Sequence, residues 1–297
     1  MKEIVVISGK GGTGKTSIVA CFAALAPKKV LADCDVDAAD LHLVLEPRIE
    51  HAEDFSGGKQ ARIIHQKCDR CGVCLEVCRF QAVKEFPNPV ESLSVDYQID
   101  PISCEGCGVC ERACPKQAIV FKPVINGKWY ISDTRHGPLV HAKLGIAQEN
   151  SGKLVTLVRN QAKILAREKN LDLIIIDGPP GIGCPVIASI TGADLVMVVT
   201  EPTQSGRHDL ERVSQLTKHF GIETLICINK WDINPDIAAR IESEAKKRGV
   251  RVAGKVRYDN TVTVAQIEKL STVEYSENGV AKDIKKLWRE VAGVLTG

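Results

Sequence analysis

Runs of apolar and β-branched residues alternate along most of the chain with segments whose apolar residues recur at helical spacing. This alternation predicts strands joined by helices, and hence an α/β fold built on a doubly wound, mostly parallel sheet with both faces covered. We expect helices at Thr16–Ala26, Arg207–Phe220 and Pro235–Arg248. We expect strands at Lys2–Ser8, Lys29–Asp37, Ile125–Ser132, Lys153–Val158, Leu173–Asp177, Leu195–Thr200, Thr224–Asn229 and Val250–Val256.

One segment does not follow this pattern. Residues 61–125 contain eight cysteines and several prolines, and they show little long-range periodicity. A chain of 297 residues is long enough for two domains. We therefore predict an α/β domain formed by residues 1–60 and 126–297, with residues 61–125 inserted as a small second domain.

The inserted segment is internally repeated. A shift of 36 residues places Gly72-Val73 on Gly108-Val109, and Gln81-Ala82 on Gln117-Ala118. The same shift aligns four cysteines with four others, namely Cys68, Cys71, Cys74 and Cys78 with Cys104, Cys107, Cys110 and Cys114. The insert is therefore one small unit that has been duplicated.

The composition limits which binding partners and which cellular compartment we expect. The formal net charge is +2, so no bulk attraction to nucleic acid or to an anionic membrane is expected. The N-terminal apolar run is too short for a signal peptide, and no segment approaches the roughly 20 apolar residues of a membrane span. We therefore expect a cytoplasmic protein whose twelve cysteines are reduced and serve as metal ligands or packed thiols.

A glycine-rich motif lies between the first predicted strand and the first predicted helix. The string "GKGGTGKT" fits the pattern G-x-x-x-x-G-K-[ST], in which backbone N–H groups surround phosphate oxygens. Lys15 is expected to contact the β- and γ-phosphates, and the Thr16 hydroxyl is expected to bind Mg²⁺. The predicted nucleotide-binding residues are those of the loop and, from a later motif, Asn229: Gly9, Lys10, Gly11, Gly12, Thr13, Gly14, Lys15, Thr16, Ser17 and Asn229.

The cysteine spacing C-x₂-C-x₂-C-x₃-C, present twice, is typical of bacterial ferredoxins with two [4Fe–4S] clusters. In that pattern the fourth cysteine of each run serves the other cluster. Thiolate tetrads also bind zinc, but zinc sites typically use separated pairs, so the spacing favours two [4Fe–4S] clusters in an α+β, ferredoxin-like insert. The predicted ligands are Cys68, Cys71, Cys74 and Cys114 for one cluster, and Cys104, Cys107, Cys110 and Cys78 for the other.

The phosphate loop carries an additional lysine, Lys10, directly after its first glycine. This form resembles the deviant phosphate loop of the MinD/ParA class of ATPases, which includes the iron protein of nitrogenase. The resemblance implies ATP hydrolysis and a dimer, formed with a second copy or with a paralogue, in which Lys10 reaches the nucleotide of the partner subunit. Over nearly its whole length, the chain resembles ATPases of this class that carry an inserted ferredoxin-like domain.

Two further strings carry this resemblance. "LIIIDGPPGIG" resembles the Walker B strand end, which implies that Asp177 holds Mg²⁺ through a water molecule. "LADCDVDAADL" resembles the switch segment of the class, in which Asp35 corresponds to the aspartate that orients the attacking water. The spacing leaves Asp33, Asp37 and Asp40 as alternatives to Asp35. The predicted catalytic residues are Lys10, Lys15, Asp35 and Asp177.

The string "INKWD" follows another predicted strand. In the MinD/ParA class an asparagine at this position, Asn229 here, contacts the base of the nucleotide. The string also fits the N-K-x-D pattern with which GTPases bind guanine. The other motifs belong to an ATP-binding class, so the prediction is ATP.

Two features of the chain have alternative interpretations. Cys184 follows Asp177 at the spacing of a bridging-cluster cysteine in the nitrogenase iron protein, but the other matching position is Asn150, so a bridging cluster is not expected. Near the C-terminus, apolar residues recur at helical spacing and form a stripe that we call the C-terminal stripe: Ile284, Leu287, Trp288, Val291 and Leu295. Such a stripe belongs either to a helix packed in the core or to a membrane-binding helix of the MinD kind, and the pattern favours the core helix.

These motifs together favour a Mg²⁺-dependent ATPase that couples dimer changes to electron transfer between two clusters and a partner protein. The alternatives are an ATPase for iron–sulfur cluster assembly and a MinD/ParA-like positioning switch with a redox-sensing module. An amide-forming ligase of the cobyrinate diamide synthase type ranks last because no glutaminase domain is recognisable.

Overall fold

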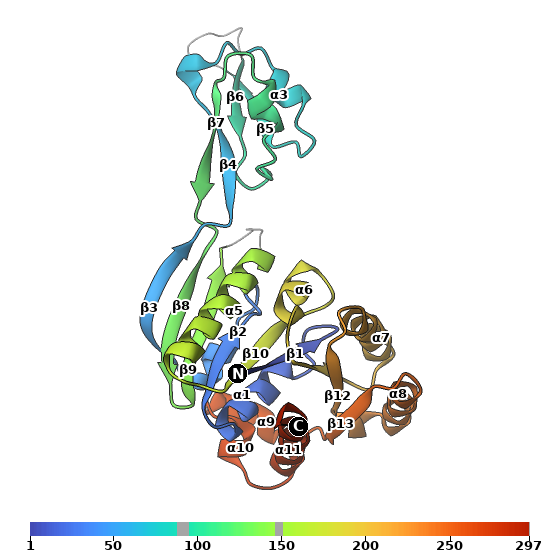
Figure 1. Cartoon of the computed structure of the whole chain (residues 1–297). Helices are drawn as coiled ribbons and strands as arrows, with labels where there is room; N and C mark the ends of the chain where they lie inside the picture. The colour runs from blue at the N-terminus through green and yellow to red at the C-terminus, as the bar shows by residue number, and fades with distance from the viewer. Residues whose placement is uncertain (88–94, 146–150, 297) are drawn as a thin grey trace. The chain divides into compact units, whose positions relative to one another are not determined.

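The computed structural model describes residues 1–87, 95–145 and 151–296 (Figure 1). Contacts divide the chain into two compact units. Unit 1 comprises Met1–Glu53, Trp129–Lys143 and Ser151–Gly297, and unit 2 comprises Asp54–Lys128 and Leu144–Asn150.

The larger sheet is mixed and largely parallel. Its order is β13-β12-β11-β1-β10-β2-β9-β8-β3, and the pairings from β13 to β9 are all parallel. Its strands are β1 (Lys2–Ser8), β2 (Lys29–Asp33), β3 (Arg48–Phe55), β8 (Gly127–Thr134), β9 (Gly137–Leu144), β10 (Leu173–Pro180), β11 (Leu195–Thr200), β12 (Glu223–Asn229) and β13 (Arg251–Val256). The central strands are buried along nearly their full length, as expected for parallel strands with helices on both faces.

Helices cover both faces of this sheet (Figure 1). One face carries α1 (Lys15–Leu25), α2 (Leu41–Leu45), α9 (Thr261–Ile267), α10 (Thr272–Tyr275) and α11 (Val280–Thr296). The other carries α5 (Ser151–Glu168), α6 (Cys184–Ile190), α7 (Gln204–His219) and α8 (Pro235–Lys247). A short 3₁₀ turn, η2 (Trp231–Ile233), follows β12. The predicted α/β fold is therefore confirmed, with an added edge of strands β3, β8 and β9.

One predicted strand is wrong. Residues 153–158 lie in the first turns of α5, not in a strand. The buried residues of α5 include Leu154, Val155, Val158 and Ala162, which recur at helical spacing. A short apolar run containing valines fits both interpretations, and in this case the longer 3.6-residue period decides for a helix. The sequence also gave no signal for β3, whose residues are almost all exposed.

The C-terminal stripe is part of the core. Ile284, Leu287 and Val291 of α11 are buried in the cluster that includes α1. The ring of Trp288 lies 4.8 Å from that of Phe22, centre to centre. The prediction of a core helix is thus confirmed. No helix within the described ranges is both long and apolar enough to cross a membrane.

Unit 2 is built from two small antiparallel sheets and short helices. β4 (Gly58–Ile63) pairs with β7 (Ile119–Val124), and β5 (Val83–Pro87) pairs with β6 (Val95–Ile99). The helical elements are η1 (His65–Lys67), α3 (Val73–Glu76) and α4 (Val109–Ala113). Its apolar core contains Cys74, with five other cysteines packed against it: Cys68, Cys78, Cys104, Cys110 and Cys114.

Candidate functional sites

The glycine-rich loop joins the carboxyl end of β1 to the first turn of α1. Gly12 (φ 78°) and Gly14 (φ 84°) adopt the left-handed conformation that favours glycine. A side chain on Gly14 would collide with the amide nitrogen of Asn229, and one on Gly9 would collide with Cβ of Asp209. Backbone conformation and close packing therefore both require glycine in this loop.

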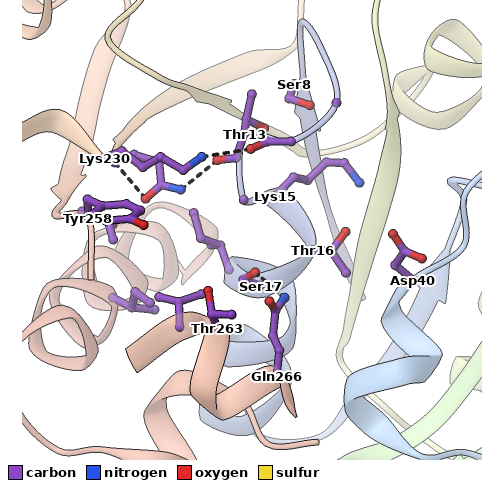
Figure 2. A pocket seen from close by; sticks show the side chains of 18 of the residues that line it. Ser8, Thr13, Lys15, Thr16, Ser17, Asp40, Lys230, Tyr258, Thr263 and Gln266 are labelled. Carbon is purple, nitrogen blue, oxygen red and sulfur yellow. Dashed lines mark hydrogen bonds between the residues drawn. The ribbon is translucent and has the colours of Figure 1, made fainter. Parts of the chain in front are cut away.

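The loop forms one wall of a cavity of about 450 Å³ (Figure 2). The cavity lies at the carboxyl ends of β1, β12 and β13, where open α/β sheets place their ligands. Predicted residues that line it are Gly11, Gly12, Thr13, Gly14, Lys15, Thr16, Ser17, Asp35 and Asn229. Gly9, Lys10 and Asp177 are not among the lining residues, although Asp177 contacts the buried end of Lys15.

Lys15 lies between two of the predicted carboxylates. Its ammonium group is 2.6 Å from Oδ1 of Asp177 and 3.4 Å from Oδ2 of Asp35. Burial by itself would lower the pKa of Lys15, but the neighbouring carboxylates, Asp177 foremost, raise it above its usual value. The lysine is therefore charged, and three residues from distant parts of the sequence meet at one point.

The four candidate aspartates of the switch segment have different surroundings. Asp33 is fully buried, and its two carboxylate oxygens accept hydrogen bonds from the N–H groups of Asp35 (3.2 Å) and Leu41 (3.2 Å). Burial, together with the charge of Asp177, raises the pKa of Asp33 well above its usual range. Asp37 is exposed, whereas Asp35 and Asp40 line the cavity. This placement leaves Asp35 and Asp40 within reach of a ligand in the cavity, and of these two Asp35 lies 3.4 Å from the ammonium group of Lys15.

Two buried oxygen atoms beside the loop lack a hydrogen-bond partner among the described residues: Oδ2 of Asp177 and Oγ1 of Thr13. Leaving such atoms unpaired is unfavourable unless a ligand, ion or water completes them. Carboxylate and hydroxyl oxygens are the donors that Mg²⁺ prefers. The donor set around Lys15 and Thr16 therefore fits a Mg²⁺–nucleotide.

Lys10 points to a carboxylate of its own chain. Its ammonium group lies 2.6 Å from Oε1 of Glu201 and 3.1 Å from Oγ of Ser205. Lys230 approaches the other oxygen of Glu201 (3.5 Å) and also donates to the carbonyl of Gly12 (3.1 Å). Burial alone would raise the pKa of Glu201, but the two lysines lower it.

Two residues of the "INKWD" string form hydrogen bonds with loops that border the cavity. The Asn229 amide donates to the carbonyl of Thr13 at 2.7 Å, which holds β12 against the phosphate loop (Figure 2). Oδ1 of Asp232 accepts the backbone N–H of Tyr258 at 2.7 Å. Asp232 thus anchors the segment after β13.

Sequence reasoning missed the part of the cavity contributed by the chain after β13. Arg257, Tyr258, Asp259 and Gln266 line it, and Gln266 donates to Oγ of Ser17 at 2.9 Å. The available signal was the position of "RYDN" at the carboxyl end of a predicted strand, where side chains face the ligand site.

The two halves of unit 2 repeat each other in three dimensions. Under the shift of 36 residues, the pair Ala61–Phe121 of β4 and β7 corresponds to the pair Tyr97–Glu85 of β6 and β5. The backbone hydrogen bonds Ile64 N–H to Ala118 O and Asp100 N–H to Ala82 O are both 2.7 Å long. The duplication in the sequence is therefore a duplication of the fold.

The cysteine runs have matching local structure. Gly72 (φ 77°) and Gly108 (φ 80°) each begin a short helix in the left-handed conformation. The N–H of Ala82 donates to Sγ of Cys78, and that of Ala118 donates to Sγ of Cys114, both at 3.3 Å. Such hydrogen bonds stabilise thiolate sulfur.

A cavity in unit 2 brings together cysteines from both runs. Its lining includes Cys68, Cys71 and Cys74 of the first run and Cys114 of the second. All twelve cysteines are free thiols. Within residues 1–87, 95–145 and 151–296, no group of three or more His, Cys, Asp or Glu side chains is arranged to hold a metal ion.

The remaining cysteines are separate from these runs. Cys21, Cys34 and Cys227 are completely buried, as expected for packed thiols. Cys184 is exposed at the first position of α6. Asn150, the other position considered for a bridging cluster, lies outside the described residues.

The fold and the loop define a nucleotide-binding protein of the phosphate-loop type. The chain matches the family described as the CobQ/CobB/MinD/ParA nucleotide binding domain over residues 4–273, and it belongs to this family. It is 37% identical over 236 residues to the uncharacterized protein MJ0578 of Methanocaldococcus jannaschii. The aligned region covers 78% of this chain and 79% of that protein.

Solved structures share the fold. One is the septum site-determining protein MinD of Pyrococcus horikoshii complexed with Mg-ADP, with 18% identity, 98% of this chain and 95% of that chain covered, and a TM-score of 0.57. Another is the MinC:MinD cell division protein complex of Aquifex aeolicus, with 18% identity, coverages of 99% and 96%, and a TM-score of 0.57. These similarities show that the chain has the same fold as these proteins.

Proposed function

We propose that the protein is a Mg²⁺-dependent ATPase that couples nucleotide-driven dimer changes to electron transfer between two [4Fe–4S] clusters and a partner protein. The observation that carries this proposal is the combination, in one chain, of two sites. One is a phosphate loop with Lys15 facing Asp35 and Asp177, and the other is a cavity lined by Cys68, Cys71, Cys74 and Cys114. We assign the second site to an insert of residues 61–125.

The nucleotide site has a part for each requirement of phosphoryl transfer to water. Thr16 and Asp177 would hold Mg²⁺, which when bound neutralises charge on the phosphate oxygens. The ammonium group of Lys15 would move from the carboxylates to the phosphates, because the loop's N–H groups hold the phosphates beside it. Asp35 borders the cavity and would orient the attacking water.

We favour adenine over guanine because the other motifs belong to an ATP-binding class. Oδ1 of Asp232 accepts the backbone N–H of Tyr258 at 2.7 Å, so this carboxylate has a structural partner in the segment after β13. The relative of known structure from Pyrococcus horikoshii was solved with Mg-ADP. Titration with ATP and GTP tests the assignment, and tighter binding of GTP would overturn it.

We assign the cysteine runs to iron–sulfur clusters from their donor chemistry and their duplication. The ligand sets would be Cys68, Cys71, Cys74 with Cys114, and Cys104, Cys107, Cys110 with Cys78. Such clusters, when bound, accept and release single electrons. The cavity joining the first three cysteines to Cys114 supports the crossed assignment, since a single zinc site within one run would not need Cys114. The N–H groups of Ala82 and Ala118 would stabilise the two crossing thiolates.

A dimer is the third part of the proposal. Lys10 would leave Glu201 and reach the nucleotide of a second copy or of a paralogue when ATP is bound. The partner that exchanges electrons is a separate one-electron carrier protein.

Anaerobic purification of the full chain tests the proposal. Iron and acid-labile sulfide should correspond to two [4Fe–4S] clusters, and EPR of the reduced protein should change when Mg-ATP is added. Unchanged spectra and an unchanged rate of electron transfer would refute the coupling. A protein that binds zinc and no sulfide would refute the cluster assignment.

A positioning switch is a second candidate, favoured by the similarity to MinD. In that case nucleotide would control association with a membrane or polymer, and the cysteine unit would sense redox state or bind a partner. Sedimentation with liposomes, with and without Mg-ATP, distinguishes the two. A cluster-assembly function instead predicts transfer of iron and sulfide to an apo-acceptor protein.

A further inference from the structure

The two halves of unit 2 differ at one corresponding position that faces the cysteine runs. Under the shift of 36 residues, Tyr97 of β6 corresponds to Ala61 of β4. The backbone pairing around them is the same in both halves, so the difference lies in the side chains. One half therefore has the large ring of Tyr97 at this position, and the other half has the methyl group of Ala61.

Tyr97 covers the first cysteine site. It is only 7% exposed and lines the same cavity as Cys68, Cys71, Cys74 and Cys114. A Cβ added to Gly72 would lie 2.9 Å from its hydroxyl oxygen. The hydroxyl donates to Oε1 of Glu85 at 3.4 Å, which helps to hold the ring in place.

The corresponding place in the second half is open. Among the described residues, and apart from the neighbouring backbone, no atom lies within 4 Å of a Cβ added to Gly108, the counterpart of Gly72. Phe121, which is paired with Ala61, packs on the apolar core of the unit. Cys74 is 8% exposed and its counterpart Cys110 is partly buried, while Cys71 and Cys107 are both exposed. The two sites therefore differ in the ring of Tyr97, which covers the first site and has only the methyl group of Ala61 as its counterpart at the second.

The surface around the second site is also more apolar. Phe80, Ile102 and Val109 are 46%, 71% and 48% exposed, and each lies within two residues of a proposed ligand of that site. Their counterparts around the first site are Lys116, Gln66 and a partly buried Val73. Exposed apolar side chains close in sequence to the proposed ligands favour contact with another protein.

We infer that the site formed by Cys104, Cys107, Cys110 and Cys78 exchanges electrons with the partner protein, while the ring of Tyr97 covers one side of the other site. This inference rests on the proposed function. One electron passes between this site and a one-electron carrier, so that one is oxidised as the other is reduced. No bond is made or broken. Tyr97 acts as a positioning and shielding residue.

Two single-site variants of the full chain allow each site to be measured alone. Cys107→Ala with Cys110→Ala leaves the first site, and Cys71→Ala with Cys74→Ala leaves the second. Each chain is purified anaerobically, its iron and sulfide are counted, and it is reduced. The measurement is the enhancement of EPR relaxation by a soluble dysprosium chelate, which reports exposure of the site and not activity.

The variant that keeps only the second site should show the larger enhancement of EPR relaxation. Adding Tyr97→Ala to the variant that keeps only the first site should remove most of the difference in enhancement between the two variants, whereas Tyr97→Phe, which keeps the ring, should leave that difference unchanged. Ala61→Tyr in the variant that keeps only the second site should reduce the enhancement, and this variant decides the matter if Tyr97→Ala does not fold. Equal enhancement in both chains, unaffected by these changes, would overturn the inference. Absence of iron and sulfide from both chains would instead overturn the proposed function.

Discussion

At the scale of single residues, the switch segment places four aspartates within eight positions but in four different environments. Asp33 has both oxygens hydrogen-bonded to backbone, Asp37 is exposed, and Asp35 and Asp40 face the cavity. Only Asp35 also approaches Lys15, at 3.4 Å. The charge and the geometry therefore distinguish Asp35 from the alternatives that the spacing in the sequence left open.

We predict that Asp35→Asn lowers kcat for ATP hydrolysis by about 10²- to 10⁴-fold, the range usual for loss of a general base, with little change in ATP affinity. Asp37→Asn is the matched control, since it removes the same charge two residues away on the exposed side. Steady-state hydrolysis and binding of a fluorescent ATP analogue measure the two effects. The assignment is wrong if Asp37→Asn is the more damaging change.

At the scale of elements, a carboxylate clamp holds α10 to the turn between β8 and β9. The guanidinium of Arg135 forms two hydrogen bonds with Glu274, at 2.8 Å and 3.1 Å, and also donates to the carbonyls of Val44 and Lys269. Glu274 in turn accepts the N–H of Ser271, completing the capping box of α10. One arginine thus connects elements more than a hundred residues apart in the sequence.

This clamp predicts a dependence of stability on pH. Burial by itself would raise the pKa of Glu274, but the hydrogen bonds from Arg135 and Ser271 lower it to about 2. A carboxyl with a lowered pKa in the folded state stabilises the fold above its unfolded pKa, and this contribution is lost as pH falls through the folded value. The midpoint of thermal unfolding should therefore decrease between about pH 4.5 and pH 2.

Glu274→Gln should unfold at a lower temperature than the wild type at pH 7 and should lose less stability over the acidic interval. Glu277→Gln, at an exposed carboxylate three residues further along, is the control and should behave as the wild type. Thermal unfolding followed by circular dichroism measures both. An equal acid sensitivity of Glu274→Gln and wild type would show that the clamp does not carry the effect.

At the scale of the whole molecule, the proposed dimer would depend on where Lys10 points. Its ammonium group pairs with Glu201 at 2.6 Å, within its own chain. A lysine held in this way must break the pair before it can reach another subunit. In the proposed dimer, Glu201 would therefore oppose the contact of Lys10 with the partner subunit.

We predict that Glu201→Gln tightens dimerisation with Mg-ATP by up to about fivefold, since a partly exposed ion pair contributes roughly 0.2–1 kcal/mol. Lys10→Ala should abolish the response to nucleotide. Glu211→Gln is a matched control, because it breaks an ion pair of α7 with Arg248 that lies away from the loop. Sedimentation velocity over a range of protein concentrations gives the dimer constants. Equal constants for Glu201→Gln and wild type would contradict the role of Glu201.

The sequence by itself determined most of the strands, the glycine positions of the phosphate loop and the duplication of the cysteine runs. It could do so because each depends on residues near one another in the chain: alternation, left-handed glycines and short spacings. It was wrong at residues 153–158, where a short apolar run fits a strand as well as the helix α5 that forms.

Only the tertiary structure decided which charges meet. Lys15 and Asp177 are 162 positions apart and become neighbours because β1 and β10 pair in parallel register. The pairing of Lys10 with Glu201, the anchoring role of Asp232 and the cover that Tyr97 gives to one cysteine site arise in the same way. These contacts depend on strand order and register, which no local pattern in the sequence contains.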